Sequence, residues 1–348
     1  MSARRHPALP HRRQRGVAVV TALLLTTLAV TIVASLFWQQ QVQVRSMENQ
    51  RLQLQTKWIL RGALDWSRLI LRQDGQDHRD YTSLLDVWAT PLAETRLDDY
   101  VERERMEGET FNASLSGQMS DAQARFNLSN LSEQRVPDEA QIAVFRRLLQ
   151  NLQIDPTLAK SVAEQVAQGQ PAPTMPLTAA DGSEMTEDQK KTAAEQLAKQ
   201  KAKQVPVTSG SEQMPIARAE DLLAVAGFNP KNLERLRDFI IVLPEKTEIN
   251  VNTAPAEVLS ALIENFSLAE ATVLVNNRKR MTCKQPADFD SQLGTHHWPT
   301  GVKTSCKSNY FLVQSQVRLD RATLDSQALI FRDSANQYKT EVKWAREE

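Results

Sequence analysis

An unbroken apolar stretch near the N-terminus dominates the hydropathy pattern of this 348-residue chain. It runs from Val17 to Trp38, and its only polar members are four threonines and one serine. Twenty-two residues of helix extend about 33 Å at about 1.5 Å per residue, which matches a hydrocarbon core about 30 Å thick. We therefore expect residues 17–38 to form a membrane-spanning helix.

A helical pattern of apolar residues continues beyond this span. The apolar positions of its single face are Leu52, Ile59, Ala63, Trp66 and Ile70. Their steps of 7, 4, 3 and 4 residues fit one side of an α-helix. Asp74-Gly75 predicts the end of the helix shortly afterwards. We therefore predict one long helix over residues 17–72, whose second half packs on a globular domain.

Alternation of polar and apolar residues predicts strands on both sides of a helical middle. The predicted strands are Gly108–Met119, Ala124–Leu128, Tyr310–Leu319, Leu324–Arg332 and Tyr338–Ala345. From Pro137 to about Thr282, apolar residues recur at helical spacing instead. This order predicts an α+β fold, in which the long N-terminal helix packs on an antiparallel sheet and a large α-helical domain is inserted.

The predicted organisation has five parts. They are a basic leader at 1–16, the long helix at 17–72, the first part of the α/β domain at 73–135, the inserted helical domain at 136–282 and the second part of the α/β domain at 283–348. Within the inserted domain, residues 169–213 are rich in Pro, Ala, Gln, Lys and Glu. That composition predicts a mobile, solvated loop with a fragile helix near Glu187–Gln204.

The leader contains five arginines and no acidic residue. These arginines are Arg4, Arg5, Arg12, Arg13 and Arg15. By the positive-inside bias, the leader stays on the cytoplasmic side of a membrane that the chain spans once, and the rest of the chain lies on the other side. A cleaved secretory signal is disfavoured because its apolar core is usually about 7–15 residues long. A simple signal anchor remains the alternative reading of this segment.

The order of these N-terminal parts resembles the type IV pilin and pseudopilin class. The basic leader ends in Gly16, the apolar helix begins at once at Val17, and an amphipathic continuation follows. The resemblance implies that a prepilin peptidase cuts between Gly16 and Val17. Thr21 then becomes the fifth residue of the mature chain, where most of the class has Glu. In that class the carboxylate is understood to pair with the N-terminal ammonium of a neighbouring subunit.

The departure at Thr21 and the length of the chain resemble the K-type minor pseudopilins of type II secretion, the GspK family. This resemblance implies a subunit at the tip of the pseudopilus that helps to initiate its assembly and the export of folded proteins across the outer membrane. It also implies the I-type and J-type minor pseudopilins, the major pseudopilin and prepilin peptidase as partners.

Two internal phrases match the same family. One is Glu248–Leu259 (EINVNTAPAEVL), in which Thr253 is a plausible helix N-cap, and it resembles the SAM-like, helix-hairpin-helix segment of K-type subunits. The other is Asp121–Leu131 (DAQARFNLSNL), at the entry to the inserted domain. The region Asp221–Phe228 resembles the helix that precedes the first phrase.

A helix-hairpin-helix also suggests a rival function, that of an anchored periplasmic protein that binds DNA or a protein partner. DNA binding by such a hairpin uses a Gly-rich turn whose N–H groups approach a phosphate. The corresponding turn here is Ile263–Ser267, with a glutamate and no glycine. The formal net charge is zero, or about −5 without the leader arginines, and gives no electrostatic reason to expect nucleic acid.

Two cysteines, Cys283 and Cys306, fall on the predicted periplasmic side, where an oxidising compartment favours a disulfide. Asp288, Asp290 and Asn309 offer oxygen ligands for the calcium that the family resemblance allows. The pair His296-His297 is better read as solvated loop than as a metal site.

Catalytic motifs are missing from the sequence: it contains no P-loop, no His-Glu-x-x-His and no Gly-x-Ser-x-Gly. Cys283 with His296 is a formal nucleophile and base, but a disulfide would disarm the thiol. We therefore do not expect an enzyme.

Overall fold

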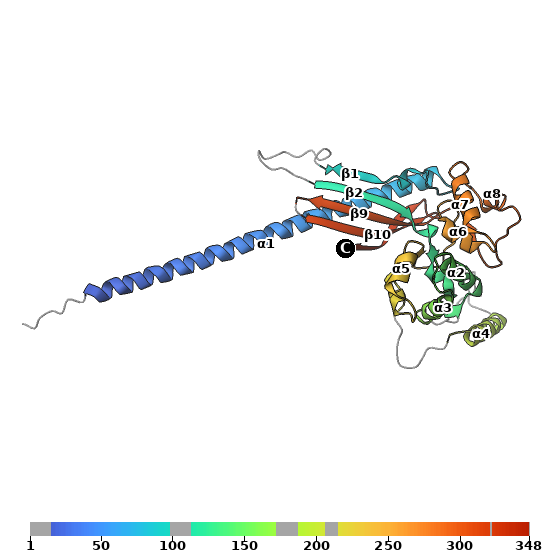
Figure 1. The fold of residues 1–348 in the computed structure, drawn as a ribbon, viewed down its shortest axis with the longest axis horizontal. Helices are drawn as coiled ribbons and strands as arrows, with labels where there is room; N and C mark the ends of the chain where they lie inside the picture. Colours follow the sequence, from blue (N-terminus) through green and yellow to red (C-terminus); the bar gives the residue numbers. More distant parts are fainter. Residues whose placement is uncertain (1–14, 98–112, 172–186, 206–214, 321, 348) are drawn as a thin grey trace, which may run out of the picture.

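The computed structural model describes residues 15–97, 113–171, 187–205, 215–320 and 322–347. A single helix, α1 (Arg15–Asp77), projects as a long rod from a head that contains the sheet and the other helices (Figure 1). At about 1.5 Å per residue, its 63 residues extend about 95 Å. The prediction of one continuous helix from the apolar span into the head is confirmed.

The predicted end of this helix at Asp74-Gly75 is wrong, because α1 continues to Asp77. Gly75 is buried, and a Cβ atom there would lie 2.5 Å from Cδ1 of Tyr338. The glycine therefore lets the C-terminal hairpin pack closely against the helix rather than ending it. Trp66 was predicted on the buried face, yet its side chain is 48% exposed.

The sheet has the order β1-β2-β9-β10-β11, and every neighbouring pair is antiparallel. Its strands are β1 (Leu92–Arg96), β2 (Ala113–Asp121), β9 (Tyr310–Leu319), β10 (Ala322–Asp333) and β11 (Lys339–Glu347). The three C-terminal strands confirm the predicted meander to within two residues at each end. In the predicted strand Gly108–Met119, residues 108–112 lie outside the described residues, and the remainder belongs to β2.

The two faces of the sheet have different partners. Phe311 and Val313 of β9 pack with Leu71 of α1, whereas Tyr310 and Leu312 pack with a strand of the inserted segment. This is the period-2 alternation expected of a central strand with both faces covered. The sheet therefore lies between the long helix and the inserted segment.

Residues 122–309 are inserted between β2 and β9, which are neighbours in the sheet. The inserted helices are α2 (Glu139–Asn151), α3 (Leu158–Gln168), α4 (Glu187–Ala202), α5 (Pro230–Leu236), α6 (Ala256–Leu262), α7 (Leu268–Asn277) and α8 (Pro286–Asp290). Short strand pairs tie them together: β3 (Phe126–Asn127) with β6 (Ile240–Ile241), β4 (Ser132–Glu133) with β5 (Val136–Pro137), and β7 (Ile249–Asn250) with β8 (Thr304–Ser305). A large apolar cluster, in which the rings of Phe126 and Phe145 stack at 5.3 Å, forms the main core of the described part of this segment.

The predicted strand Ala124–Leu128 is largely wrong. Only Phe126–Asn127 pairs as a strand, between the 3-10 turns η3 (Ala122–Ala124) and η4 (Leu128–Leu131). The side chains of Asp121 and Asn127 each accept a hydrogen bond from the backbone N–H two residues later. Such local bonds favour tight turns over strand pairing, although the alternation of apolar residues is that of a strand.

A helix was expected near Glu187–Gln204 in the low-complexity region 169–213, and α4 confirms it. The described side chains of this helix are exposed or half-exposed. Residues 172–186 and 206–214 lie outside the described residues, and so does most of the predicted loop.

Candidate functional site

The membrane-spanning part of α1 carries the first candidate site. Arg15 and Gly16 are already helical, and Val17, the predicted first residue of the mature chain, is 66% exposed. The hydroxyl of Thr21 donates to the carbonyl oxygens of Val17 and Ala18, each at 3.0 Å. This side chain is therefore neutral and its donor is satisfied within its own helix.

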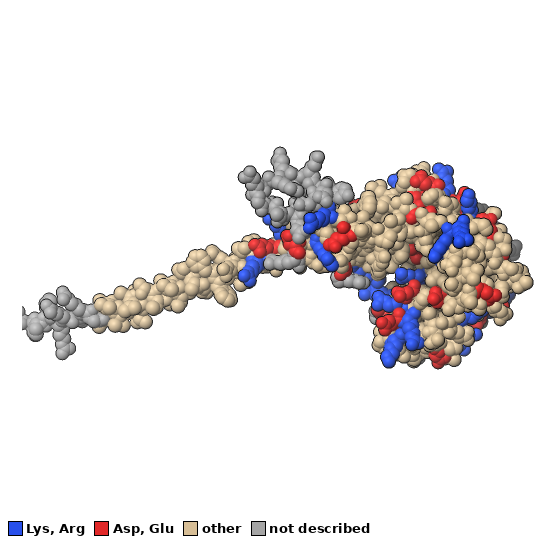
Figure 2. Space-filling view, turned by 45° about the horizontal axis from the view of Figure 1, so that its top comes forward, with Lys and Arg blue, Asp and Glu red and all other residues tan. Residues whose placement is uncertain are grey.

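The rest of this half of α1 is an uncharged apolar rod (Figure 2). Its most apolar window has a mean hydropathy of 2.5, and none of that window is buried against the rest of the chain. Exposed threonine hydroxyls donate to helix carbonyls in the preceding turn, as Thr26 does to Leu23 at 2.9 Å. The length and composition of the helix are sufficient to cross a membrane.

A second site is a buried group of polar side chains around Asp121, at the end of β2. Oδ2 of Asp121 accepts hydrogen bonds from Asn250 at 3.0 Å and from the hydroxyls of Thr253 and Ser308 at 2.5 Å each. Oδ1 accepts the backbone N–H of Gln123 at 2.8 Å. Burial raises the pKa of Asp121, while these donors oppose the shift. The carboxylate at the end of β2 therefore binds two separate parts of the inserted segment. Asn250 and Thr253 lie just before α6, and Ser308 lies just before β9.

The same network reaches the end of α1 through Arg332 of β10. The Arg332 guanidinium donates to Oδ2 of Asp74 at 2.7 Å and to the carbonyl oxygen of Leu71 at 3.1 Å. Its other nitrogen donates to the Thr82 hydroxyl at 2.9 Å and to the carbonyl oxygen of Ser308 at 3.1 Å. Asp74 and Arg332 are both almost fully buried. A buried pair of this kind fixes geometry more than it adds net stability.

Thr82 joins the two halves of this network, which we call the polar junction. Asn250 donates to the carbonyl oxygen of Thr82 at 3.1 Å, and the Ser308 N–H donates to its hydroxyl at 3.2 Å. The polar junction consists of Asp74, Thr82, Asp121, Asn250, Thr253, Ser308 and Arg332. It links the long helix, the sheet and the start of the α6 region through buried bonds, and so fixes how the inserted segment sits on the helix.

His78 adds a titratable group to one edge of the polar junction. Its Nδ1 atom lies 3.0 Å from Oδ1 of Asp74 and 3.6 Å from Oδ1 of Asp86. The hydrogen bond to Asp74 is the main reason that the pKa of His78 is raised. Burial is the main reason that the pKa of Asp86 is raised. The sequence pattern does not indicate this group, because its members become neighbours only through the turn that follows α1.

The two family phrases meet beside the polar junction. Amide side chains of the phrase Asp121–Leu131 hydrogen-bond to the backbone just before the phrase Glu248–Leu259: Asn127 donates to the carbonyl oxygen of Glu245 at 2.7 Å, and Asn130 both donates to and accepts from the backbone of Thr247. The prediction of Thr253 as a helix N-cap is wrong, because Pro255 occupies that position and the Thr253 hydroxyl bonds Asp121 instead.

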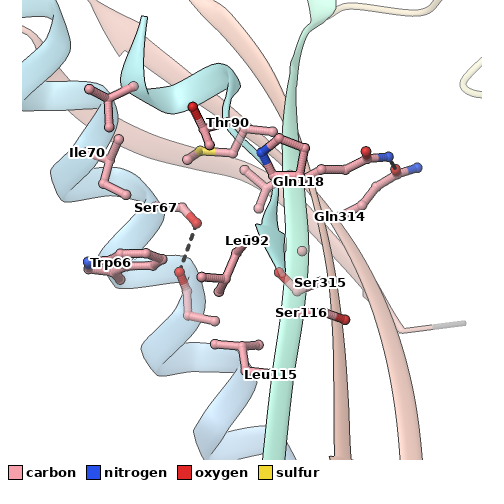
Figure 3. A pocket seen from close by; sticks show the side chains of 16 residues that line it. Trp66, Ser67, Ile70, Thr90, Leu92, Leu115, Ser116, Gln118, Gln314 and Ser315 are labelled. Atoms are coloured by element: carbon pink, nitrogen blue, oxygen red, sulfur yellow. Dashed lines mark hydrogen bonds between the residues drawn. The ribbon is translucent and has the colours of Figure 1, made fainter. Parts of the chain in front are cut away.

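A third site is an apolar groove between α1 and the edge of the sheet, with a cavity of about 220 Å³ (Figure 3). Trp66 and Ile70 come from α1, Leu92 from β1 and Leu115 from β2. Ser67, the polar residue of the helical wall, donates to the carbonyl oxygen of Ala63, so its hydroxyl is satisfied. The groove therefore suits an apolar group.

The predicted disulfide partners Cys283 and Cys306 are both buried, and their sulfur atoms are unbonded in the structure. Asn252 donates to both of their carbonyl oxygens, at 2.8 Å and 3.4 Å, and so brings the two chain segments together. Burial raises the pKa of Cys283 to about 11 and that of Cys306 to about 12. Neither thiol is thereby activated as a nucleophile. The disulfide itself stays a prediction.

Of the candidate calcium ligands, Asp288 accepts the backbone N–H groups of Lys284 and Gln285 at the start of α8. Asp290 accepts from the indole N–H of Trp298. These carboxylates thus have protein partners, and Asn309 donates its backbone N–H to Gln123 on the sheet side of the insertion. Calcium binding by these residues stays a prediction. The contacts of the two carboxylates with protein donors do not favour it.

The hairpin between α6 and α7 has the polar turn expected from the sequence. Asn265 has a φ of 55°, and Ser267 and Glu270 form a capping box at the start of α7. Glu264 is exposed, with an oxygen 3.8 Å from Arg147. A carboxylate at this turn repels a phosphate, so the hairpin geometry favours a structural role.

Comparisons with known proteins point to one family. Two family models, both described as type II secretion system protein K, match residues 124–245 and 249–298. Type II secretion system protein K of Pseudomonas aeruginosa is 29% identical over 317 residues, which cover 88% of this chain and 86% of that protein. The protein of the same name from Pectobacterium carotovorum is 27% identical over 336 residues, which cover 91% and 92% of the two chains.

A solved structure has the same fold. It is a chain of the GspK-GspI-GspJ complex from the type II secretion system of enterotoxigenic Escherichia coli. The TM-score is 0.58 at 17% sequence identity, and the match covers 87% of this chain and 99% of that one. The arrangement of rod, sheet and inserted helices is therefore shared at low sequence identity.

Proposed function

The chain belongs to the type II secretion system protein K family and acts as a minor pseudopilin in type II secretion, and from this premise we propose that it occupies the distal tip of the pseudopilus. In this position it starts the assembly of the fibre, and other subunits add beneath it. Assembly of the fibre supports the export of folded proteins across the outer membrane.

The observation that carries this proposal is the environment of Thr21. In the pilin class, a carboxylate at this position attracts the N-terminal ammonium of the subunit already in the fibre. Here the hydroxyl is neutral and bonded to its own helix through Val17 and Ala18. An unpaired charge in hydrocarbon is costly, so a subunit without the carboxylate loses this way of adding beneath another. Its own N-terminal ammonium can still receive the next subunit.

The shape of the head supports the same placement. The inserted segment enlarges the head on the side of the sheet away from α1, at the end of the rod remote from the apolar half (Figure 1). The polar junction holds this segment in a defined position on the long helix. A bulky, fixed head fits the end of a fibre better than its interior, where subunits above and below need the space.

The location and the partners follow from the anchor and the family. We assign the single span to the inner membrane and the head to the periplasm, because the arginines of the leader favour the cytoplasmic side. The I-type and J-type minor pseudopilins are the proposed partners, since the structural relative was solved in a complex with proteins of those names. The work of the chain is assembly and not catalysis.

The proposal is tested first by processing. Co-expression with prepilin peptidase should yield a mature chain that begins at Val17, as read by mass spectrometry. An uncut leader would indicate an ordinary signal-anchored protein, and a cut near Ala34 would indicate a secreted protein. Either outcome would contradict processing as a pseudopilin.

Tip placement is tested by restoring the carboxylate. We expect Thr21→Glu to move the subunit into internal positions of the fibre, where gold-labelled antibody detects it along the length. The matched control is Thr26→Glu, which puts the same charge in the same span where it cannot mimic the class position. If the Thr21→Glu protein is still labelled only at the tip, the missing carboxylate does not explain the tip position.

A further inference from the structure

Three side chains of the kinds that bind metals converge at the end of α1. Asp74, His78 and Asp86 each offer one ligand atom, and these atoms lie within 4.8 Å of one another. Nδ1 of His78 is 3.0 Å from Oδ1 of Asp74 and 3.6 Å from Oδ1 of Asp86. In a tetrahedral zinc site with bonds of about 2.1 Å, neighbouring ligand atoms are about 3.4 Å apart. The two contacts of Nδ1 therefore lie close to the separation that a zinc ion requires.

The last turn of α1 brings the first two ligands together. Asp74 and His78 are four residues apart, and the His78 backbone N–H donates to the carbonyl oxygen of Asp74 at 2.8 Å. This bond continues the helical pattern one residue beyond the end of α1. Residues four apart are neighbours on a helix surface, so the local backbone alone places the imidazole beside the carboxylate.

The third ligand comes from the turn before the short 3-10 helix η1 (Val87–Ala89). Oδ2 of Asp86 accepts the Ser83 backbone N–H at 2.7 Å and the indole N–H of Trp88 at 3.3 Å. Trp88 is itself fully buried, so these donors hold the carboxylate in a fixed orientation. Oδ1 accepts the Ser83 hydroxyl at 3.2 Å and has a second lone pair for an ion.

The two carboxylates are buried and held in the same manner. Their side chains are only 3% and 4% exposed, and protein donors bind Oδ2 of each, Arg332 in the case of Asp74. Outer partners of this kind orient the ligands of a metal. Arg332 balances the charge of Asp74, while the ion-pair partner of Asp86 is His78. The second buried charge is therefore compensated by what Nδ1 of His78 holds, either a proton or a metal ion.

The ligand set indicates the class of ion. Calcium takes about six to eight oxygen ligands, whereas this group offers two carboxylate oxygens and one imidazole nitrogen. Zinc accepts such a mixed set and needs only four ligands. The His78 side chain is 34% exposed although both carboxylates are buried, so water reaches the group on the His78 side and can supply the fourth ligand.

We propose that Asp74, His78 and Asp86 bind one zinc ion through Oδ1, Nδ1 and Oδ1 respectively, with water as the fourth ligand. The ion ties the last turn of α1 to the turn that leads into η1, beside the polar junction. It thereby fixes the chain at the point where it leaves the long helix for the sheet. This site is separate from the residues predicted to bind calcium, and it does not depend on the position of the subunit in the fibre.

The test uses the full-length chain without a polyhistidine tag, purified in detergent and stripped of metal with a chelator. A proton on Nδ1 competes with the ion, so zinc is added at about pH 8 and the metal-free chain is measured with the chelator present. After dialysis, elemental analysis should find one zinc per chain. Zinc should raise the unfolding midpoint and calcium should not. His78→Asn should weaken zinc binding more than about 100-fold, the upper end of the cost of losing an outer partner.

The matched control is His296→Asn, which makes the same substitution at a histidine 3.5 Å from Glu270 elsewhere in the head. It should bind zinc as the wild type does. Asp86→Asn keeps an oxygen acceptor for Ser83 but loses the charge, and it should also lose the zinc. Unfolding in the chelator shows that each variant is folded. Equal zinc binding by the wild-type and His78→Asn chains would overturn the site, and so would a wild-type chain that takes up no zinc or binds calcium more tightly.

Discussion

At the residue scale, two glycines on the same helix should respond in opposite ways to the same substitution. Gly75→Ala places a Cβ atom 2.5 Å from the ring of Tyr338, and we expect a loss of about 1–3 kcal/mol of unfolding free energy. Gly62→Ala meets open space, and we expect a gain of up to about 1 kcal/mol from helix propensity. Denaturant unfolding of the purified full-length chain in detergent measures both changes.

Each glycine variant is the control for the other, since helix propensity favours alanine equally at both positions. Two changes of the same sign would contradict the packing assigned to Gly75. The pair also shows what single-residue propensity cannot predict. Asp74-Gly75 reads as a helix stop, but α1 continues through it, and the close approach of Tyr338, which is remote in the sequence, explains why a glycine stands there.

At the element scale, the contact of His78 with the last turn of α1 should make stability depend on pH. The pKa of His78 is raised above its ordinary value of 6.5, chiefly by the hydrogen bond to Asp74. The folded state therefore favours protonated His78. Its stabilisation is complete below about pH 6.5 and is lost as the pH rises through the raised pKa. We expect the unfolding midpoint of the full-length chain to fall as the pH rises over that range.

The variant His78→Asn tests this assignment, because the asparagine amide can still donate to Asp74 but does not titrate. The fall in midpoint above about pH 6.5 should largely disappear. The raised pKa of Asp86 also makes stability fall with rising pH, but from its ordinary value of 3.8 upward, so it contributes at lower pH. An unchanged slope in the His78→Asn protein would mean that another group titrates.

Elements were predictable where one local signal dominated. In the long helix and in the three C-terminal strands, the apolar residues recur at one clear period, and all four elements are present in the structure. The strand predicted over Ala124–Leu128 fails because the side chains of Asp121 and Asn127 bond the local backbone. A sequence pattern does not show which of these two interactions prevails, since the tertiary partners of both polar side chains lie more than a hundred residues away.

For the whole molecule, the sequence indicated the family and its two phrases, but not what the phrases do. Both phrases read as local helix or strand signals, whereas in the structure their polar residues hold the inserted segment on the sheet and the long helix. Asp121, Asn250 and Ser308 are far apart in the chain and meet only in the folded state. Such a network depends on topology, so neither spacing nor composition predicts it.

Compartment and fold together give the last prediction, that Cys283 and Cys306 form a disulfide when the head folds in the periplasm. The bond closes a loop with 22 residues between the cysteines and should add about 3 kcal/mol to the unfolding free energy. Asn252 already holds the two backbone segments together, so the native packing need change little. Thiol titration of the denatured, membrane-extracted chain should find no free thiol, and reduction should lower the unfolding midpoint.

The double variant Cys283→Ala, Cys306→Ala provides the control, because its midpoint should not respond to the reductant. A chain retained in the cytoplasm by deletion of residues 1–38 should contain two titratable thiols, since that compartment keeps cysteines reduced. Two free thiols in the membrane-extracted protein would contradict either the disulfide or the periplasmic location of the head. Accessibility of the head to protease added outside the inner membrane separates these two explanations, because only a periplasmic head is cut.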